Sequence, residues 1–177
     1  SLPAQAGVPA RGAAKRPEAQ MEAELSSMKR RLILSFLFLI PLFYISMGHM
    51  MGAPLPAFLV GHENAISFAF TQLLLTLPIL YINDKYYKNG FRSLLHGGPN
   101  MDSLIAVGSI AAVIYGVFAI YQIGYGLGHG DMARVEQYHM DLYFESAGMI
   151  LTLITLGKFL ETRSKGKTSQ AISRLMD

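Results

Sequence analysis

The sequence predicts an all-α membrane protein with four membrane-spanning helices, and two observations carry this prediction. Hydrophobic residues make up 51% of the 177-residue chain, and they fall in long apolar blocks. A helix rises about 1.5 Å per residue, so a block of roughly twenty residues covers the ~30 Å of hydrocarbon in a bilayer. The Lys and Arg residues that give the net charge of +3 lie beside these blocks, which is typical of membrane topology signals.

The chain divides into a leading segment, a membrane domain and a trailing segment. Residues 1–28 are rich in Ala, Pro and Gly and bury too little apolar surface to offset their ordering entropy, which predicts a flexible linker whose last part can start a helix. The membrane domain is expected over 29–161, and 162–177 are expected to begin a connection to a domain outside this sequence. Pro41 and Pro78 lie inside spans, where neighbouring groups can satisfy the carbonyls that they free. The predicted spans are about 32–51, 65–82, 102–123 and 142–160.

The basic residues predict the orientation of the spans, because loops rich in Lys and Arg face the cytosol. Three segments are basic: the one before the first span, the loop between the second and third spans, and the end of the fourth span with its continuation. They hold Lys29, Arg30, Arg31, then Lys85, Lys88, Arg92, then Lys158, Arg163, Lys165, Lys167 and Arg174. The other two connections, 52–64 and 124–141, contain a single basic residue, Arg134. We therefore expect a multi-pass protein of the cell membrane with both termini in the cytosol.

The loop between the second and third spans, residues 84–96, is too polar to cross the membrane. Its apolar residues recur at helical spacing, with the basic residues on the other sides. This pattern predicts an amphipathic helix on the cytosolic membrane surface, and the Gly97-Gly98-Pro99 run ends it. Two interpretations of this helix remain open: a basic membrane anchor, or a docking platform for an acidic partner that uses Lys85, Lys88 and Arg92.

Two carboxylates and one thioether near span ends are the candidate site residues. In the predicted orientation, Met101 begins the third span and Glu161 ends the fourth on the cytosolic side, whereas Glu145 lies near the outer side. The sixteen positions that separate the two glutamates correspond to roughly 24 Å of helix. A carboxylate at the edge of a span is costly and marks a functional candidate. A thioether beside a carboxylate suits a transient Cu(I) site, because soft sulfur binds Cu(I).

A second group of soft side chains lies near the predicted outer ends of the spans. Its members are Met47, His49, Met50 and Met51 at the outer end of the first span, and His129, Met132, His139 and Met140 in the last outer connection. Thioether and imidazole groups suit Cu(I), so a metal-release path is one interpretation. Membrane packing is the other, because Met fills irregular gaps. Packing and interfacial roles are also the alternatives for Met101, Glu145 and Glu161.

Composition limits the remaining chemistry. The chain contains no Cys, which excludes disulfides, thiolate metal ligands and Cys nucleophiles within these residues. The basic residues form no stripe with interleaved aromatics, so we expect no nucleic-acid partner. No secretory signal is expected, because the first apolar block begins at Leu32 and is long enough to span. Since the sequence starts with Ser rather than Met, we expect a chain that is processed, engineered or cut from something longer.

Three runs of residues resemble one family. The run PNMDSLIAVG (99–108) resembles the start of the third membrane helix of copper-transporting P-type ATPases, a subfamily of the heavy-metal P-type ATPases. The run 143–161, with YFESA at its start and LGKFLE at its end, resembles their fourth membrane helix. The tail RSKGKTSQAISRLM (163–176) resembles the helix that leads into the family's actuator domain. The sequence is thereby identified as similar to the amino-terminal membrane part of a Cu(I) exporter.

The resemblance implies a role for each candidate. Met101 and Glu161 match the family's cytosolic uptake site, which receives Cu(I) from a copper chaperone, and Glu145 matches a carboxylate on the release path. The basic surface helix matches the family's docking platform for that chaperone. ATP and Mg²⁺ act in domains that lie elsewhere in such proteins, so we expect no catalytic residue here and no enzymatic activity of this fragment alone. Membrane lipid and the remainder of the ATPase chain are the other expected partners.

Two other functions remain alternatives. A Zn(II) or Cd(II) cargo would keep the family, although the Asn100-Met101 pair favours copper. A stand-alone tetraspan protein that binds metal without catalysis would need no further domains. One departure from the family's pattern concerns the bend before the surface helix, where relatives often have glycines and where Ile82-Asn83-Asp84 stands here.

Overall fold

The computed structural model describes the backbone of residues 8–176, in which helices predominate and no strand forms, so the all-α prediction is confirmed. The helices are α1 (Val8–Met51), α2 (Ala65–Ile82), α3 (Asp84–Leu95), α4 (Met101–His129), α5 (Met132–Met140) and α6 (Phe144–Met176), with short 3-10 turns η2 (Ala57–Leu59) and η3 (His62–Asn64). The chain forms two compact units. The larger is Ile33–Ile154, and the smaller consists of the described residues within Ser1–Leu32 and Thr155–Asp177.

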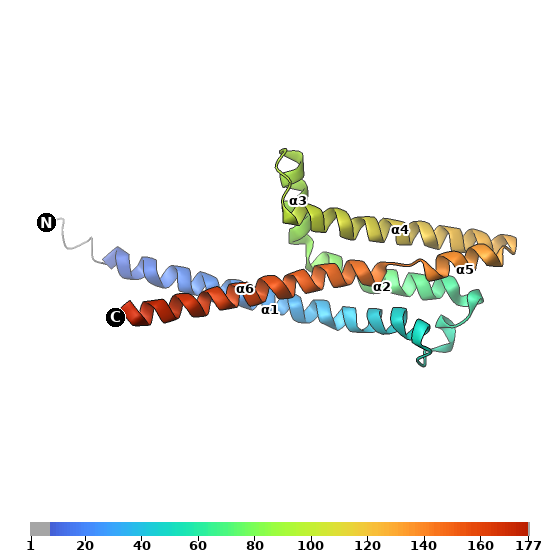
Figure 1. Ribbon diagram of the computed structural model, residues 1–177, viewed down its shortest axis with the longest axis horizontal. Helices are drawn as coiled ribbons and strands as arrows, with labels where there is room; N and C mark the ends of the chain where they lie inside the picture. Colours follow the sequence, from blue (N-terminus) through green and yellow to red (C-terminus); the bar gives the residue numbers. More distant parts are fainter. Residues whose placement is uncertain (1–7, 177) are drawn as a thin grey trace. The chain divides into compact units, whose positions relative to one another are not determined.

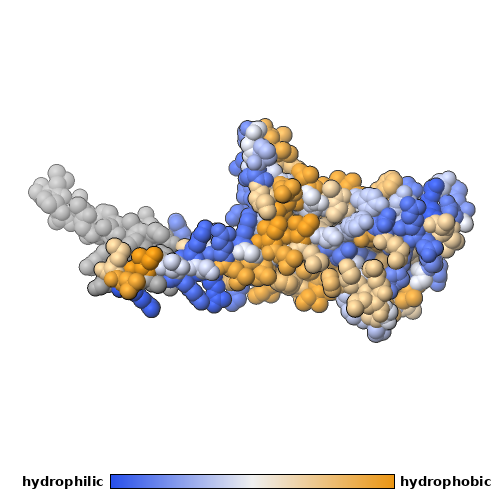
Figure 2. Space-filling model, viewed as in Figure 1, coloured by the Kyte–Doolittle hydropathy of each residue, from blue (hydrophilic) through white to orange (hydrophobic). Residues whose placement is uncertain are grey.

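Four helical stretches are long and apolar enough to cross a membrane, so the four-span prediction is confirmed. They are Glu18–Met51, His62–Ile82, Met101–His129 and Met132–Thr168. Each predicted span lies within one of them, and α2 has the bounds predicted for the second span. Figure 2 shows apolar side chains over the middle of the larger unit's helices and hydrophilic side chains around α5.

The helices that lead into the first span and out of the fourth are longer than the spans. Residues 8–28, which the sequence assigns to a flexible linker, belong to α1. The part from 18 to 28 is rich in Ala, Glu, Gln and Met, which favour helix. α6 likewise continues unbroken to Met176. Within the smaller unit α1 and α6 approach closely, since a Cβ on Gly166 would lie 2.8 Å from the sulfur of Met21.

The chain bends between α2 and α3 at Asn83, which is fully buried. Its Nδ2 donates hydrogen bonds to the Oγ of Ser35 in α1 and to the carbonyl oxygen of Ile79 one turn earlier, both at 2.9 Å. After the bend, α3 runs across the direction of α4 (Figure 1). The surface helix predicted over 84–96 is thus present as a helix. Asn83 thus ties the bend to α1.

Glycines let the helices of the larger unit approach closely. A Cβ on Gly148 of α6 would lie 3.2 Å from side-chain carbons of both Ile79 and Leu39. A Cβ on Gly116 of α4 would clash with the ring of Phe144, which is fully buried at the start of α6. Membrane helices associate largely through such close packing, because lipid tails are as apolar as their own side chains.

Defined caps set the bounds of α4 and α5. The Asn100 side-chain oxygen accepts a hydrogen bond from the backbone N–H of Ser103 (3.0 Å), and the Ser103 hydroxyl accepts one from the backbone N–H of Asn100 (3.3 Å). The two residues thus form a capping box at the start of α4. α4 extends past the predicted span to His129 and ends at Gly130, whose φ is 70°. The connection that follows, which the sequence treats as a loop, folds into α5 with Asp131 as its N-cap.

Candidate functional site

One pocket in the larger unit gathers residues from four parts of the chain. It has a volume of about 220 Å³. Its lining consists of Ser46, His49 and Met50 from α1, Phe68 and Gln72 from α2, His139 and Met140 from α5, and Leu142, Tyr143 and Glu145 at the start of α6. The fold therefore brings the Glu145 carboxylate together with two imidazoles and two thioethers that lie far apart in the sequence.

Imidazole and phenyl rings pack together at one side of this pocket. The His139 ring, which is 5% exposed, stacks on Phe68 with centroids 4.7 Å apart and meets the edge of the His49 ring at 4.6 Å. The His62 ring lies 5.9 Å from that of His139. The sequence predicts His49 and His139 as soft side chains near the same membrane face, but their direct contact depends on α5 folding back over α1 and α2.

Several buried polar atoms at the pocket have no hydrogen-bond partner among the residues that the structure describes. They are Nε2 of His139, Oε2 of Glu145, and both amide atoms of Gln72. Gln72 is fully buried and was not among the residues predicted from the sequence. The sequence could have indicated Gln72, since it is an amide side chain inside a largely apolar span. An unpaired polar group away from water costs several kcal/mol, so these atoms favour a polar or ionic ligand in the pocket.

The pocket does not contain a closed metal centre of the hard or borderline type. No group of three or more His, Asp or Glu residues in the described part of the chain is arranged to hold a metal ion. What the pocket offers instead is a mixed set of thioether, imidazole and carboxylate groups on different helices. Such a set suits a soft ion that stays only briefly, because it supplies soft ligands without a preformed cage.

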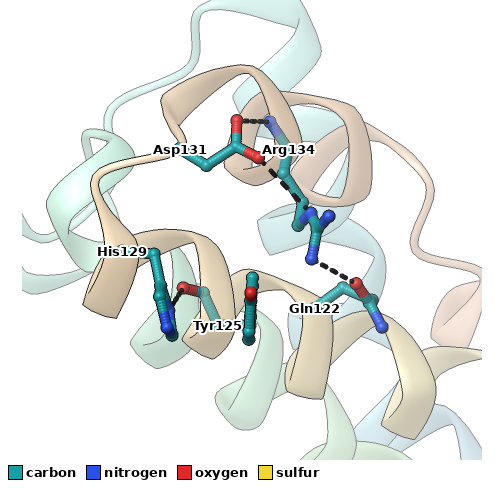
Figure 3. Close-up of polar contacts among 5 residues, drawn as sticks. All are labelled: Gln122, Tyr125, His129, Asp131 and Arg134. Carbon is teal, nitrogen blue, oxygen red and sulfur yellow. Dashed lines mark hydrogen bonds and ion pairs between the residues drawn. The ribbon is translucent and has the colours of Figure 1, made fainter.

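The turn between α4 and α5 is held by a polar cluster that fixes the course of α5 (Figure 3). The Arg134 guanidinium lies between the Asp131 carboxylate (3.5 Å) and the Gln122 side-chain oxygen (3.3 Å) and covers the Tyr125 ring at 4.6 Å. The His129 ring stacks on the other side of Tyr125, with centroids 3.9 Å apart. These contacts tie α5 to α4 and so determine where His139 lies. They also place His129 in this cluster rather than in the pocket.

Other predicted soft side chains likewise lie outside the pocket lining. Met47, Met51 and Met132 are not among its lining residues. Exposure does not separate the two groups, because the pocket residues Met50 and Met140 are 68% and 58% exposed and Met132 is 46% exposed. The pocket thus separates His49, Met50, His139 and Met140 from the remaining members of the soft group.

The two residues predicted as an uptake site lie in different units of the fold. Met101 is the first residue of α4 in the larger unit and is 60% exposed. Glu161 belongs to the smaller unit, where its carboxylate forms an exposed ion pair with Lys165 at 3.0 Å. An exposed pair of this kind contributes little to stability, so Glu161 can exchange its partner.

The basic residues of the predicted platform are exposed on α3. Lys85, Lys88 and Arg92 all face solvent, and Lys88 pairs with Asp84 at 3.0 Å. Tyr86 and Gly90 form the buried side of the helix, and Leu95 at its end is 85% exposed. α3 therefore presents a basic surface with an apolar tip, which suits a membrane surface and an acidic partner alike.

Comparisons with known proteins find relatives of this chain. Copper-transporting ATPase 1 of Rhizobium meliloti is 37% identical over 172 residues, which are 94% of this chain and 19% of that protein. A copper-exporting P-type ATPase of Staphylococcus epidermidis is 34% identical over 155 residues (87% and 18%). A probable copper-importing P-type ATPase A of Enterococcus hirae is 35% identical over 161 residues (89% and 19%). The chain spans about a fifth of the length of these relatives. No family model and no solved structure matches the chain.

Proposed function

We propose, from the similarity of this chain to copper-transporting P-type ATPases over most of its length, that it forms the amino-terminal membrane part of an ATP-driven Cu(I) exporter. The structural observation that supports this most is the pocket of about 220 Å³ that Glu145 lines together with two imidazoles and two thioethers. In this proposal the domains that bind ATP and Mg²⁺ belong to other parts of the full protein, and this fragment alone hydrolyses no ATP.

The pocket is the proposed release side of the metal path. The distribution of Lys and Arg favours cytosolic termini, which places the end of α1, α5 and the start of α6 on the outer side. There Met50 and Met140 supply soft sulfur and His49 and His139 supply imidazole nitrogen, while Glu145 adds negative charge. Thioether sulfur and imidazole nitrogen are ligands that suit Cu(I). Because the set forms no closed cage, the ion can leave toward the exterior.

The proposed uptake side consists of Met101 and Glu161, with α3 as the platform for a cytosolic copper chaperone. Met101 is exposed enough for its sulfur to accept an ion, and Glu161 is held only by an exposed pair with Lys165. Lys85, Lys88 and Arg92 would attract an acidic face of the chaperone, since complementary charge speeds association. The outward direction of transport is part of the proposal, because one relative is named as exporting and another as importing.

The test is ATP-dependent uptake of Cu(I) by inside-out membrane vesicles that contain the full-length protein. We expect Met101→Leu to raise the Cu(I) concentration needed for half-maximal uptake. Glu145→Gln is expected to lower the maximal rate about tenfold, equivalent to ~1.4 kcal/mol of barrier. Matched controls are Met132→Leu and Glu136→Gln, which change exposed residues outside the pocket.

Each result bears on a different part of the proposal. Wild-type kinetics for Glu145→Gln would exclude the pocket from the release path, and wild-type kinetics for Met101→Leu would exclude the uptake site. Uptake stimulated only by Zn(II) or Cd(II) would change the cargo. Absence of ATP-driven uptake of any metal would refute the pump and favour a tetraspan protein without catalysis.

A further inference from the structure

α3 and the first turn of α4 approach so closely that only a glycine fits between them. Gly90 is buried in the middle of α3, and a Cβ on it would clash with the carbonyl oxygen of Asp102 and lie 2.9 Å from the Ser103 amide nitrogen. Both are backbone atoms, which cannot turn aside as the end of a side chain can. Glycine inside a helix costs roughly 1 kcal/mol relative to alanine. The approach of α4, and not helix formation, therefore explains Gly90.

Hydrogen bonds join the two helices at the same place. The Ser103 hydroxyl donates to the carbonyl oxygen of Gly90 at 2.6 Å, and Nδ2 of Asn100 donates to the Ser93 hydroxyl at 3.0 Å. Ser103 is 4% exposed, so its bond to Gly90 is shielded from water. Asn100 and Ser103 also form the capping box of α4. The residues that start α4 thus also fasten it to α3.

A third bond lies about one turn earlier in α3 and nearly two turns later in α4. The hydroxyls of Tyr87 and Ser109 are 2.7 Å apart, and Ser109 donates to the carbonyl oxygen of Ile105 at 2.8 Å. Tyr87 is therefore the donor in its bond to Ser109. Burial raises the pKa of Tyr87, while the bond to Ser109 acts in the opposite direction, so the hydroxyl keeps its proton. The contact between α3 and α4 consequently extends over two turns.

We call the contact of Gly90 and Ser93 with residues 100–103 the α3–α4 joint. Met101 lies within this stretch of α4, yet its side chain is exposed. Its neighbour Asn100 bonds to Ser93 of α3, and its other neighbour Asp102 packs its backbone against Gly90. The Met101 side chain itself is 60% exposed. The thioether therefore projects from backbone that is fixed relative to α3 on both sides.

We propose that Gly90 and Ser103 are positioning residues that hold Met101 at a fixed place relative to α3, so that a Cu(I)-carrying protein bound to α3 meets the thioether in one geometry. This inference rests on the proposed function of α3 as a platform and of Met101 as an ion acceptor. It adds that transfer from the carrier depends on the joint between the helices, whereas acceptance of freely diffusing Cu(I) does not, since a small complex can approach from any direction.

The test compares two Cu(I) sources in the full-length protein with Gly90→Ala: the cytosolic copper chaperone and the Cu(I)–glutathione complex. A displacement of about 1 Å can slow a reaction on the order of 100-fold when two groups must meet in one geometry. We therefore expect the chaperone concentration that half-saturates ATPase activity to rise roughly tenfold to a hundredfold. The half-saturating concentration of Cu(I)–glutathione and the maximal rate are expected to change less than about twofold. The matched control is Gly128→Ala in α4, where a Cβ meets nothing within 4 Å. Ser103→Ala removes the bond to Gly90 without adding volume, and it is expected to give the same selective effect in a smaller degree.

Hydrogen exchange of the same full-length variants measures the joint independently of transport. Gly90→Ala is expected to speed exchange in α3 and in the first two turns of α4 together, and Gly128→Ala is not. Unchanged exchange over residues 84–109 in both Gly90→Ala and Ser103→Ala would overturn the joint. Faster exchange with equal loss for both copper sources would overturn its role in transfer. A wild-type protein without copper-stimulated ATPase activity would instead refute the proposed function, with the exchange result still reporting on the joint.

Discussion

Replacement of Asn83 by alanine tests how the bend between α2 and α3 is maintained. Asn83 is fully buried, and its Nδ2 donates two hydrogen bonds of 2.9 Å, one to Ser35 in α1 and one to the Ile79 carbonyl. The alanine variant loses both bonds and leaves the Ser35 hydroxyl without this donor. The half-buried Asn89 of α3 provides a matched control, because Asn89→Ala makes the same chemical change on the neighbouring helix.

The magnitude follows from the lost bonds. Hydrogen bonds between membrane helices contribute ~0.6 kcal/mol on average and at most ~1.7 kcal/mol, and a buried partner left unpaired costs about 1–3 kcal/mol. Asn83→Ala is therefore expected to lower the free energy of unfolding by about 1–3 kcal/mol, and Asn89→Ala by less than about 0.5 kcal/mol, the usual range away from such features. In a double-mutant cycle with Ser35→Ala, the coupling energy is expected to be about 0.6–1.7 kcal/mol.

The assay is reversible unfolding in mixed micelles with increasing SDS, followed by circular dichroism, for the wild type, the two single variants, their double variant and Asn89→Ala. Equal stability of Asn83→Ala and Asn89→Ala would refute the account of the bend. A coupling energy of zero between Ser35 and Asn83 would show that α1 does not stabilise the bend, however much stability Asn83→Ala alone removes.

Three further predictions concern the pocket and the packing around it. Gly116→Ala forces a Cβ into the Phe144 ring and is expected to destabilise the fold by about 1–3 kcal/mol in the same SDS assay, against the helix-propensity gain that alanine otherwise brings. Gln72→Leu removes two unpaired buried amide atoms, so we expect it to raise stability by about 1 kcal/mol or more while slowing copper uptake; a loss of stability would contradict the assignment of Gln72 as a functional residue. Arg134→Ala removes the contacts that tie α5 to α4 and is expected to speed amide exchange in α5 measured by mass spectrometry, whereas unchanged exchange would exclude this cluster as the anchor of α5.

Hydropathy and charge predict most of the architecture of this chain. Each predicted span lies within one of the four apolar stretches of the structure, although α6, the helix of the fourth span, begins only at Phe144, and α2 and α3 match their predicted ranges closely. This succeeds because an apolar block of about twenty residues has few alternatives to a helix in a bilayer. The nine-residue α5 could not be predicted from hydropathy. It is polar and short, and it depends on Asp131 as a cap and on Arg134 contacts to α4.

The sequence could predict which residue types form the candidate site, but not which of these residues lie together in the fold. The sequence predicts eight Met and His residues near one membrane face, and only the fold of α5 selects His49, Met50, His139 and Met140 for the pocket. Gln72 could have been noticed as an amide in an apolar span. Gly90 could not, because its significance depends on the α4 backbone that packs against it, which lies more than ten residues away in the sequence.

The most direct test of the central proposal is phosphoenzyme formation from labelled ATP by the full-length protein, with Cu(I) and Zn(II) compared under the same conditions. We expect acid-stable labelling that Cu(I) stimulates and that Met101→Leu shifts to higher Cu(I) concentration. Labelling stimulated by Zn(II) alone would contradict the proposed cargo, and absence of labelling with either metal would contradict the assignment of this chain to a copper pump.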